Sequence, residues 1–405
     1  MLKSALSLNR SLHSATLGSP LPGRAAPSTG TGRRLSSMEL PEQRNETKIS
    51  LGLLPAAACV ADRGLRFAAS VMARHVVGVA TTIVALGLYG WMQAASAATL
   101  DYAHAEPLAS HALLLDAAIA GERLVVVGER GLILLSDDQG VHWRQALVPT
   151  RTTLTAVFFL DALNGWAVGH ESLILRTRDG GLTWTPVEHS ANSDMPLFAI
   201  RFFSARRGLA VGAQGTALAT DDGGGHWSAH SLVADTDSHF YSIAATRDGT
   251  LYLAGEAGGA YRSTDRGTSW QHLRMPQAGS YFGVIALEDN AVMFYGLRGQ
   301  IALSRNRGKT FEPIDAGTQA SLFGARVLSN GNLVLVGAGG SAFVSRAPYR
   351  NFTPVKLAVR GSVLGLLPAG PHALILYGEK GVNRVADDTL LPDPSGAGAR
   401  TGASP

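Results

Sequence analysis

A short phrase recurs about every forty residues, and this period constrains the fold more than any other feature of the sequence. Each copy carries a Gly-x-x-Gly turn, with Ser172 replacing the second glycine in one copy. The first glycines of the seven turns lie 41 to 43 residues apart: Gly128, Gly169, Gly212, Gly255, Gly296, Gly337 and Gly378. Self-similarity at such a period is typical of solenoids and propellers.

A second marker follows the turns after a short apolar run and reads Ser/Thr-x-Asp-x-Gly-x-Thr/His/Ser-aromatic. It resembles the Asp-box of sialidases and related propellers. We expect the carboxylate to accept hydrogen bonds within its own turn, and the aromatic ring to anchor the next strand. The four clear copies therefore supply structural residues rather than catalytic ones: Asp138, Trp143, Asp179, Trp184, Asp222, Trp227, Asp265 and Trp270.

Between the markers the chain reads as short apolar strands, without a convincing helical period. Four strands of four to six residues fit one period, which is the size of a propeller blade. Six small residues share one repeat position, as expected where strands crowd at a propeller axis: Ala156, Ala199, Ser242, Gly283, Gly324 and Gly365. The sequence predicts an all-β fold, a seven-bladed β-propeller of four-stranded blades over residues 98–385.

The seventh copy has no Asp-box and no fourth strand after Val385. Counting 41 residues back from Trp143 reaches Tyr102, and residues 102–108 look like the fourth strands at 184–189 and 352–357. We therefore expect the N-terminal segment to supply the outer strand of the last blade, which would remove an open sheet edge.

The N-terminal region is typical of an exported protein. Residues 76–91 form an uncharged apolar run between Arg74 and Ala95-Ser-Ala97, which predicts a signal peptide over 72–97 with cleavage near Ala97. The run is shorter than the ~20 residues of a spanning helix, and an uncleaved membrane anchor is the alternative. We expect a periplasmic or secreted protein, or a thylakoid lumenal one if the host is photosynthetic.

The two ends of the chain lack the repeat. Residues 1–71 are rich in Pro, Gly and Ser, and we interpret them as an over-extended gene model, with a transit peptide as the alternative. The tail over 386–405 has a composition typical of disorder.

Composition excludes several function classes. Residues 1–97 hold 10 of the 35 basic and 4 of the 31 acidic side chains, so residues 98–405 carry 25 and 27 and a net charge of −2. That balance gives no reason to expect a nucleic-acid partner. The single cysteine, Cys59, precedes the propeller, and the histidines show no metal-ligand spacing. We expect no metal and no cofactor.

Asp-boxes raise the possibility of a glycoside hydrolase. Catalysis in the sialidase family needs an arginine triad, a tyrosine nucleophile and an acidic aspartate, and a Phe-Arg-Ile-Pro-type motif is absent here. Other glycosidases need two carboxylates roughly 5–10 Å apart. The axial strands offer only Asp116, so catalysis is disfavoured. A sialidase-like hydrolase or a carbohydrate-binding propeller remains the alternative.

The phrase over 164–169, followed by the box over 175–184, closely resembles the photosystem II stability/assembly factor family. The resemblance extends over residues ~101–385. It implies a seven-bladed lumenal or periplasmic propeller without enzymatic activity. We expect the propeller to be monomeric. Such a scaffold would hold a membrane-protein or envelope-complex partner during assembly. A role in photosystem assembly does not follow, because function lies in sites grafted on a fold.

Blade topology predicts one face for a partner. The Gly-x-x-Gly turns share a face with the loops that link the blades, and the Asp-boxes lie on the opposite face. On the first face, cations of blades 1 and 7 make a basic sector, tempered by Glu129 and Glu379: Arg130, Arg151, Arg360 and Lys380. Solvated surface charge is the plain interpretation. The sharper hypothesis is a docking patch for an acidic or carboxylate-bearing segment.

Overall fold

The computed structural model describes residues 101–190, 194–232 and 237–387. All of the described residues belong to one compact unit of the chain. The expected leader over 1–71, the expected signal peptide over 72–97 and the tail beyond Asp387 lie outside the described residues.

Seven antiparallel sheets follow one another along the described chain, each with its strands in sequence order. Blade 1 contains β1 (Leu114–Ala120), β2 (Arg123–Gly128), β3 (Ile133–Ser136) and β4 (Arg144–Gln145). Blade 2 contains β5 (Leu154–Phe159), β6 (Gly165–Gly169), β7 (Ile174–Thr177) and β8 (Thr185–Pro186). Blade 3 contains β9 (Leu197–Phe202), β10 (Gly208–Gly212), β11 (Ala217–Thr220) and β12 (Ser228–Ala229). Blades 4 and 5 contain β13 (Phe240–Ala245), β14 (Leu251–Gly255), β15 (Ala260–Ser263), β16 (Gln271–His272); β17 (Tyr281–Ala286), β18 (Val292–Gly296), β19 (Ile301–Ser304) and β20 (Glu312–Ile314). Blades 6 and 7 contain β21 (Leu322–Val327), β22 (Leu333–Gly337), β23 (Ser341–Ser345), β24 (Thr353–Lys356); β25 (Val363–Pro368), β26 (Ala373–Gly378) and β27 (Gly381–Ala386).

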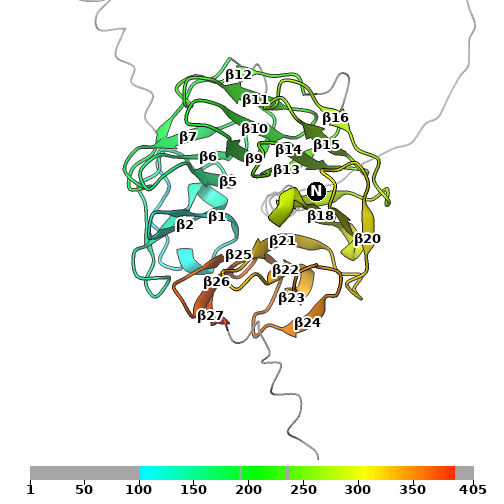
Figure 1. Ribbon diagram of the computed structural model, residues 1–405. Helices are drawn as coiled ribbons and strands as arrows, with labels where there is room; N and C mark the ends of the chain where they lie inside the picture. The colour runs from blue at the N-terminus through cyan, green and yellow to red at the C-terminus, as the bar shows by residue number, and fades with distance from the viewer. Residues whose placement is uncertain (1–100, 191–193, 233–236, 388–405) are drawn as a thin grey trace, which may run out of the picture. The chain divides into compact units, whose positions relative to one another are not determined.

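The sheets form a closed ring around a central channel (Figure 1). The innermost strands β1, β5, β9, β13, β17, β21 and β25 each contact the next, and β25 contacts β1. The helical pieces in the described residues are single 3₁₀ turns: η2 (Ala109–His111), η3 (Glu129–Gly131), η4 (Glu288–Asn290), η5 (Leu297–Gly299) and η6 (Ala338–Gly340). Among these residues no helix has the length and apolar character to cross a membrane. The predicted all-β seven-bladed propeller is confirmed.

One backbone hydrogen bond recurs in every Gly-x-x-Gly turn. The residue after the first glycine donates its N–H, at 2.9–3.1 Å, to the carbonyl just before the blade's innermost strand, as Glu129 does to Leu113 and Glu379 to Ser362. A β-carbon on any of the seven first glycines would lie only 2.0–2.7 Å from that same carbonyl oxygen. The glycine is therefore needed because the carbonyl approaches where a side chain would stand.

The box carboxylates accept hydrogen bonds from side chains and backbone N–H groups of their own turns. Asp265 accepts hydrogen bonds from the Ser269 N–H at 2.9 Å, the Ser269 hydroxyl at 2.6 Å and the Ser263 hydroxyl at 2.7 Å. The other three box aspartates, Asp138, Asp179 and Asp222, accept equivalent bonds. In blade 5, Asn306 takes the same place and accepts from the Thr310 N–H at 2.9 Å.

The box tryptophans lie beside their own turns or in the packing between blades. The indole N–H of Trp184 donates to the Gly181 carbonyl at 2.9 Å, and that of Trp270 to Gly267 at 3.2 Å. Trp227 is buried and meets Phe202 edge to face, with ring centroids 5.7 Å apart. Trp143 packs against buried residues of blades 1 and 7.

The expected closure of the last blade by an N-terminal strand is wrong for the described residues. Blade 7 has three strands, and residues 101–108 form no strand. They run along blade 1 instead, where Ala103 N donates to Val148 O at 2.9 Å. The Gln145 side chain bonds both the His104 carbonyl at 2.7 Å and the Glu106 N–H at 3.0 Å. These partners belong to blade 1, so the backbone of residues 101–108 bonds to blade 1 rather than adding a strand to β27.

We expect the box carboxylates to make stability sensitive to acid. Hydrogen bonds from the Ser269 side chain and backbone hold the pKa of Asp265 well below its usual range. The stability that this carboxylate contributes is therefore present above its unfolded pKa, about 4, and is lost as the pH falls below that value. Asp265→Asn should flatten the pH dependence of the urea unfolding midpoint between about pH 5 and pH 3.

Asn306→Asp is the matched control, since it adds a titrating group at the equivalent place in blade 5. It should make the acid loss of stability steeper. Parallel pH profiles for both variants and the parent protein would contradict this account of the boxes.

Candidate functional site

The predicted basic sector begins on the rim of blade 1. Arg130 lies in the turn η3, and its side chain is 68% exposed. Arg151 lies in the loop that leads to blade 2, and a β-carbon on Gly131 would approach its Cα to 3.3 Å. The turn and the blade-linking loop are therefore neighbours on one face.

The chain's own N-terminal segment supplies acids to this part of the sector. Glu106 pairs with Arg130 at 3.4 Å, and Asp101 pairs with Arg151 at 3.7 Å. All four side chains are at least a third exposed, so each pair contributes roughly 0–1 kcal/mol. Sequence reasoning missed these acids because it assigned residues 102–108 to the edge of blade 7.

Arg360 and Lys380 form the blade 7 part of the sector, and both are exposed. A β-carbon on Gly361 would lie 3.3 Å from Lys380 Cγ, so the two cations come from adjacent loops. Neither makes an ion pair within the described residues. The neighbouring carboxylate of Glu379 makes no ion pair with either cation and accepts a hydrogen bond from the Ser362 N–H at 2.8 Å.

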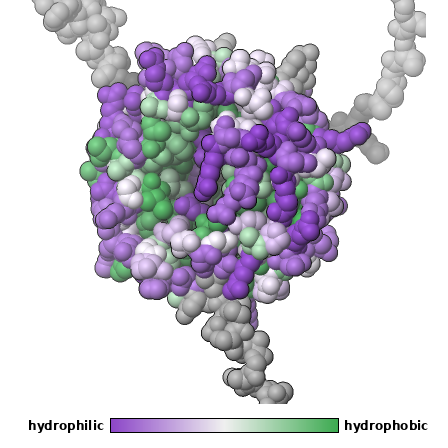
Figure 2. All heavy atoms as spheres, in the orientation of Figure 1, coloured by the Kyte–Doolittle hydropathy of each residue, from purple (hydrophilic) through white to green (hydrophobic). Residues whose placement is uncertain are grey.

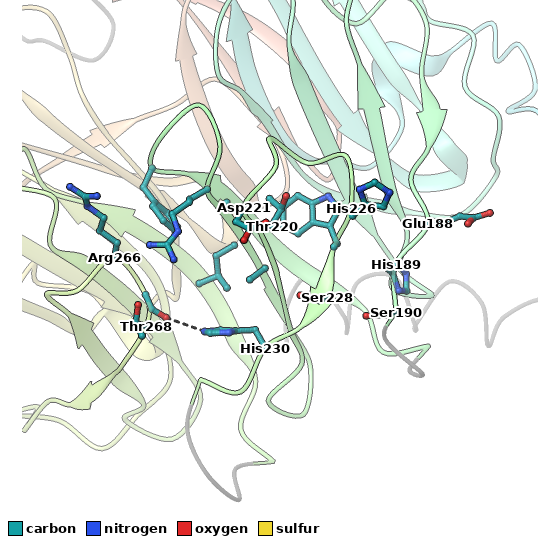
Figure 3. Close-up of a pocket in the computed structure, with 17 residues that line it drawn as sticks. Glu188, His189, Ser190, Thr220, Asp221, His226, Ser228, His230, Arg266 and Thr268 are labelled. Carbon is teal, nitrogen blue, oxygen red and sulfur yellow. Dashed lines mark hydrogen bonds between the residues drawn. The ribbon is translucent and has the colours of Figure 1, made fainter.

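A surface groove of about 630 Å³ lies between the outer parts of blades 2, 3 and 4 (Figure 3). Two of its histidines bond neighbouring groups, whereas His189 Nδ1 is buried without a hydrogen-bond partner in the described structure. His226 bonds Asp222 at 2.7 Å through Nδ1, and His230 Nε2 lies 3.0 Å from the Gly267 carbonyl. Within the described ranges no three His, Cys, Asp or Glu residues are grouped to hold a metal ion. We assign no chemistry to this groove.

The central channel is a cavity of about 510 Å³ lined by the innermost strands, and Asp116 is the only carboxylate among its described lining residues. In the strand register Asp116 pairs with Val127 as Ala156 pairs with Val168, so it occupies the position that is small in the other blades. Its Oδ2 accepts the Val157 N–H of blade 2 at 3.0 Å. The Tyr377 hydroxyl donates to Oδ1 at 3.4 Å, and burial with the Asp116 charge raises the pKa of Tyr377.

Two axial glycines make room for tyrosines that the sequence analysis did not single out. Gly283 pairs with Tyr295 and Gly365 with Tyr377. A β-carbon would lie 2.2 Å and 2.1 Å from the tyrosine ring or hydroxyl. Strand crowding, the reason first expected for small axial residues, applies at Gly324, whose β-carbon would lie 2.6 Å from the Leu364 carbonyl. The missed signal was a tyrosine on the second strand opposite each of these two glycines.

A model of the family described as photosynthesis system II assembly factor YCF48 matches residues 135–356. The chain belongs to this family. It is 44% identical over 50 residues to the photosystem II stability/assembly factor HCF136 of Cyanidioschyzon merolae. That match covers 12% of this chain and 11% of the relative's length.

Two solved structures resemble the propeller in fold. One is YCF48 bound to D1 peptide, with a TM-score of 0.59, 17% identity, and coverage of 72% of this chain and 96% of that chain. The other is virginiamycin B lyase from Staphylococcus aureus, with a TM-score of 0.61, 12% identity, and coverage of 71% and 98%. Propellers similar to this YCF48-family chain thus include both a peptide-binding assembly factor and a lyase.

In this YCF48-family propeller, Asp116 should stabilise the junction of blades 1 and 2. Asp116→Ala leaves the Val157 N–H without its acceptor, and we expect the free energy of unfolding to fall by about 1–2 kcal/mol in urea titrations at neutral pH. Ser242→Ala is the control, since Ser242 holds the equivalent N–H of Val284 by a longer contact of 3.4 Å. Equal losses in the two variants would show that the charge and the shorter bond contribute nothing.

Proposed function

We propose that this protein is an exported, non-enzymatic propeller that holds a membrane-protein partner while a membrane complex is assembled or maintained. Membership of the YCF48 family supports an assembly role. A YCF48 relative has been solved with D1 peptide, which supports a protein segment as ligand. The observation that carries the proposal is the basic sector, in which cations come from the turns and loops of two neighbouring blades. The propeller as a whole has no excess of basic over acidic residues, so this group of cations does not simply reflect its composition.

The partner segment would be acidic or would end in a carboxylate. Arg360 and Lys380 make no ion pair within the described residues and can receive it directly. Arg130 and Arg151 hold Glu106 and Asp101 only through exposed pairs. Exchanging such a pair for a partner's carboxylate costs little, because exposed ion pairs are weak. Arginine also offers paired donors that match carboxylate geometry.

The absence of catalysis is part of the proposal. Glycoside hydrolysis commonly uses two carboxylates across the scissile bond. The described channel lining has Asp116 alone, and that side chain already accepts the Val157 N–H. Export is proposed from the signal-like sequence over 72–97.

Reversing charge in the sector should release the partner. We expect Arg360→Glu/Lys380→Glu to reduce co-purification of a membrane protein from detergent-solubilised host membranes by about fivefold or more, because attraction becomes repulsion. The measurement is affinity purification of the tagged protein, followed by quantitative mass spectrometry of the recovered membrane proteins.

Arg178→Glu/Lys309→Glu is the matched control. It reverses one arginine and one lysine, both exposed and both in box turns on the opposite face. The control should retain the partner. If the two double variants recovered the same membrane proteins in the same amounts, the sector would have no part in docking.

A further inference from the structure

Two arginines line the central channel. Arg201 on β9 and Arg326 on β21 lie two residues after the small axial residues Ala199 and Gly324, so they occupy equivalent positions in blades 3 and 6. Neither pairs with a carboxylate within 4.0 Å among the described residues. Burial lowers the pKa of both guanidinium groups, and for Arg326 the interactions with Tyr377 and Asp116 act in the opposite direction.

Arg201 is the more isolated of the two. Its Nε atom is buried and has no hydrogen-bond partner in the described structure. Its Cζ lies 5.9 Å from the centre of the Phe158 ring, which offers only a cation–π contact. The guanidinium is partly buried and its Nε has no partner, so an anion that entered the channel would gain from pairing with it.

One end of the channel carries an arc of aromatic rings. The four rings come from consecutive blades and occupy the position just before the small axial residue: Phe198, Tyr241, Phe282 and Phe323. We name this set the aromatic collar. Successive ring centroids are 5.8, 5.6 and 5.8 Å apart. Figure 2 shows the ring hollowed near its centre.

The distance between the aromatic collar and the two arginines along the strands is similar to the length of a small organic molecule. Phe198 and Arg201 lie three residues apart on β9, and Phe323 and Arg326 lie three apart on β21. At about 3.3 Å per residue this separates the two levels by about 10 Å along the strands. The cavity of about 510 Å³ is within the range usual for small-molecule sites.

We propose that the central channel binds an aromatic organic anion, with its ring against the aromatic collar and its acid group at the level of the channel that Arg201 and Arg326 line. Asp116 lies between the two levels and disfavours a second negative charge on the ligand. The site therefore selects a monoanion with an apolar body. This binding site is separate from the rim sector and does not depend on the docking function proposed above.

Isothermal titration of the full chain with 2-naphthoate tests the site. We expect one saturable site per chain. Arg201→Gln and Arg326→Gln should each weaken binding about tenfold or more, since each removes a charge-assisted contact. The uncharged analogue 2-naphthamide should bind at least about tenfold more weakly than 2-naphthoate to the parent protein. Phe282→Leu should weaken the binding of both compounds.

Arg207→Gln is the control, because Arg207 is exposed outside the channel, and it should leave the affinity unchanged. Circular dichroism verifies that each variant is folded, and Arg201→Lys, which keeps the charge, provides a second variant that should lose less affinity than Arg201→Gln. The proposal is overturned if 2-naphthoate does not saturate, if 2-naphthamide binds equally well, or if folded arginine-to-glutamine variants bind like the parent protein.

Discussion

The hydrogen bond between each Gly-x-x-Gly turn and the start of its own blade underlies the rest of the structure. In all seven blades the residue after the first glycine donates to the carbonyl that precedes the innermost strand. This contact sets where the inner strand begins relative to the rim of its blade. The seven turns and the blade-linking loops consequently gather on one face, while the inner strands line one channel. Both proposed binding regions depend on that arrangement.

The repeat allowed the fold to be predicted because a propeller blade is built from local contacts that recur at one period. The period and the spacing of the turns were enough to predict seven blades. They could not predict the path of residues 101–108. Those residues resemble outer strands in sequence, but the Gln145 side chain, far along the chain, gives their backbone its partners on blade 1.

The candidate sites were predicted in part, for a similar reason. The four cations of the basic sector follow from blade topology alone, and the structure places them on loops of blades 1 and 7. The acids Asp101 and Glu106 could not be foreseen, because their position depends on the misassigned N-terminal segment. In the channel, the sequence analysis named Asp116 but missed Tyr295 and Tyr377, since their hydroxyls reach the axis from second strands only where the first strand has glycine.

The central claim is that a membrane protein docks on the face that carries the turns. The most direct measurement is site-specific photo-cross-linking in the host cell, with a benzophenone amino acid placed at position 380 or, on the box face, at position 309. The account predicts an adduct with an integral membrane protein from position 380 and none from position 309. Identical adducts from both positions, or no membrane-protein adduct from position 380, would contradict it.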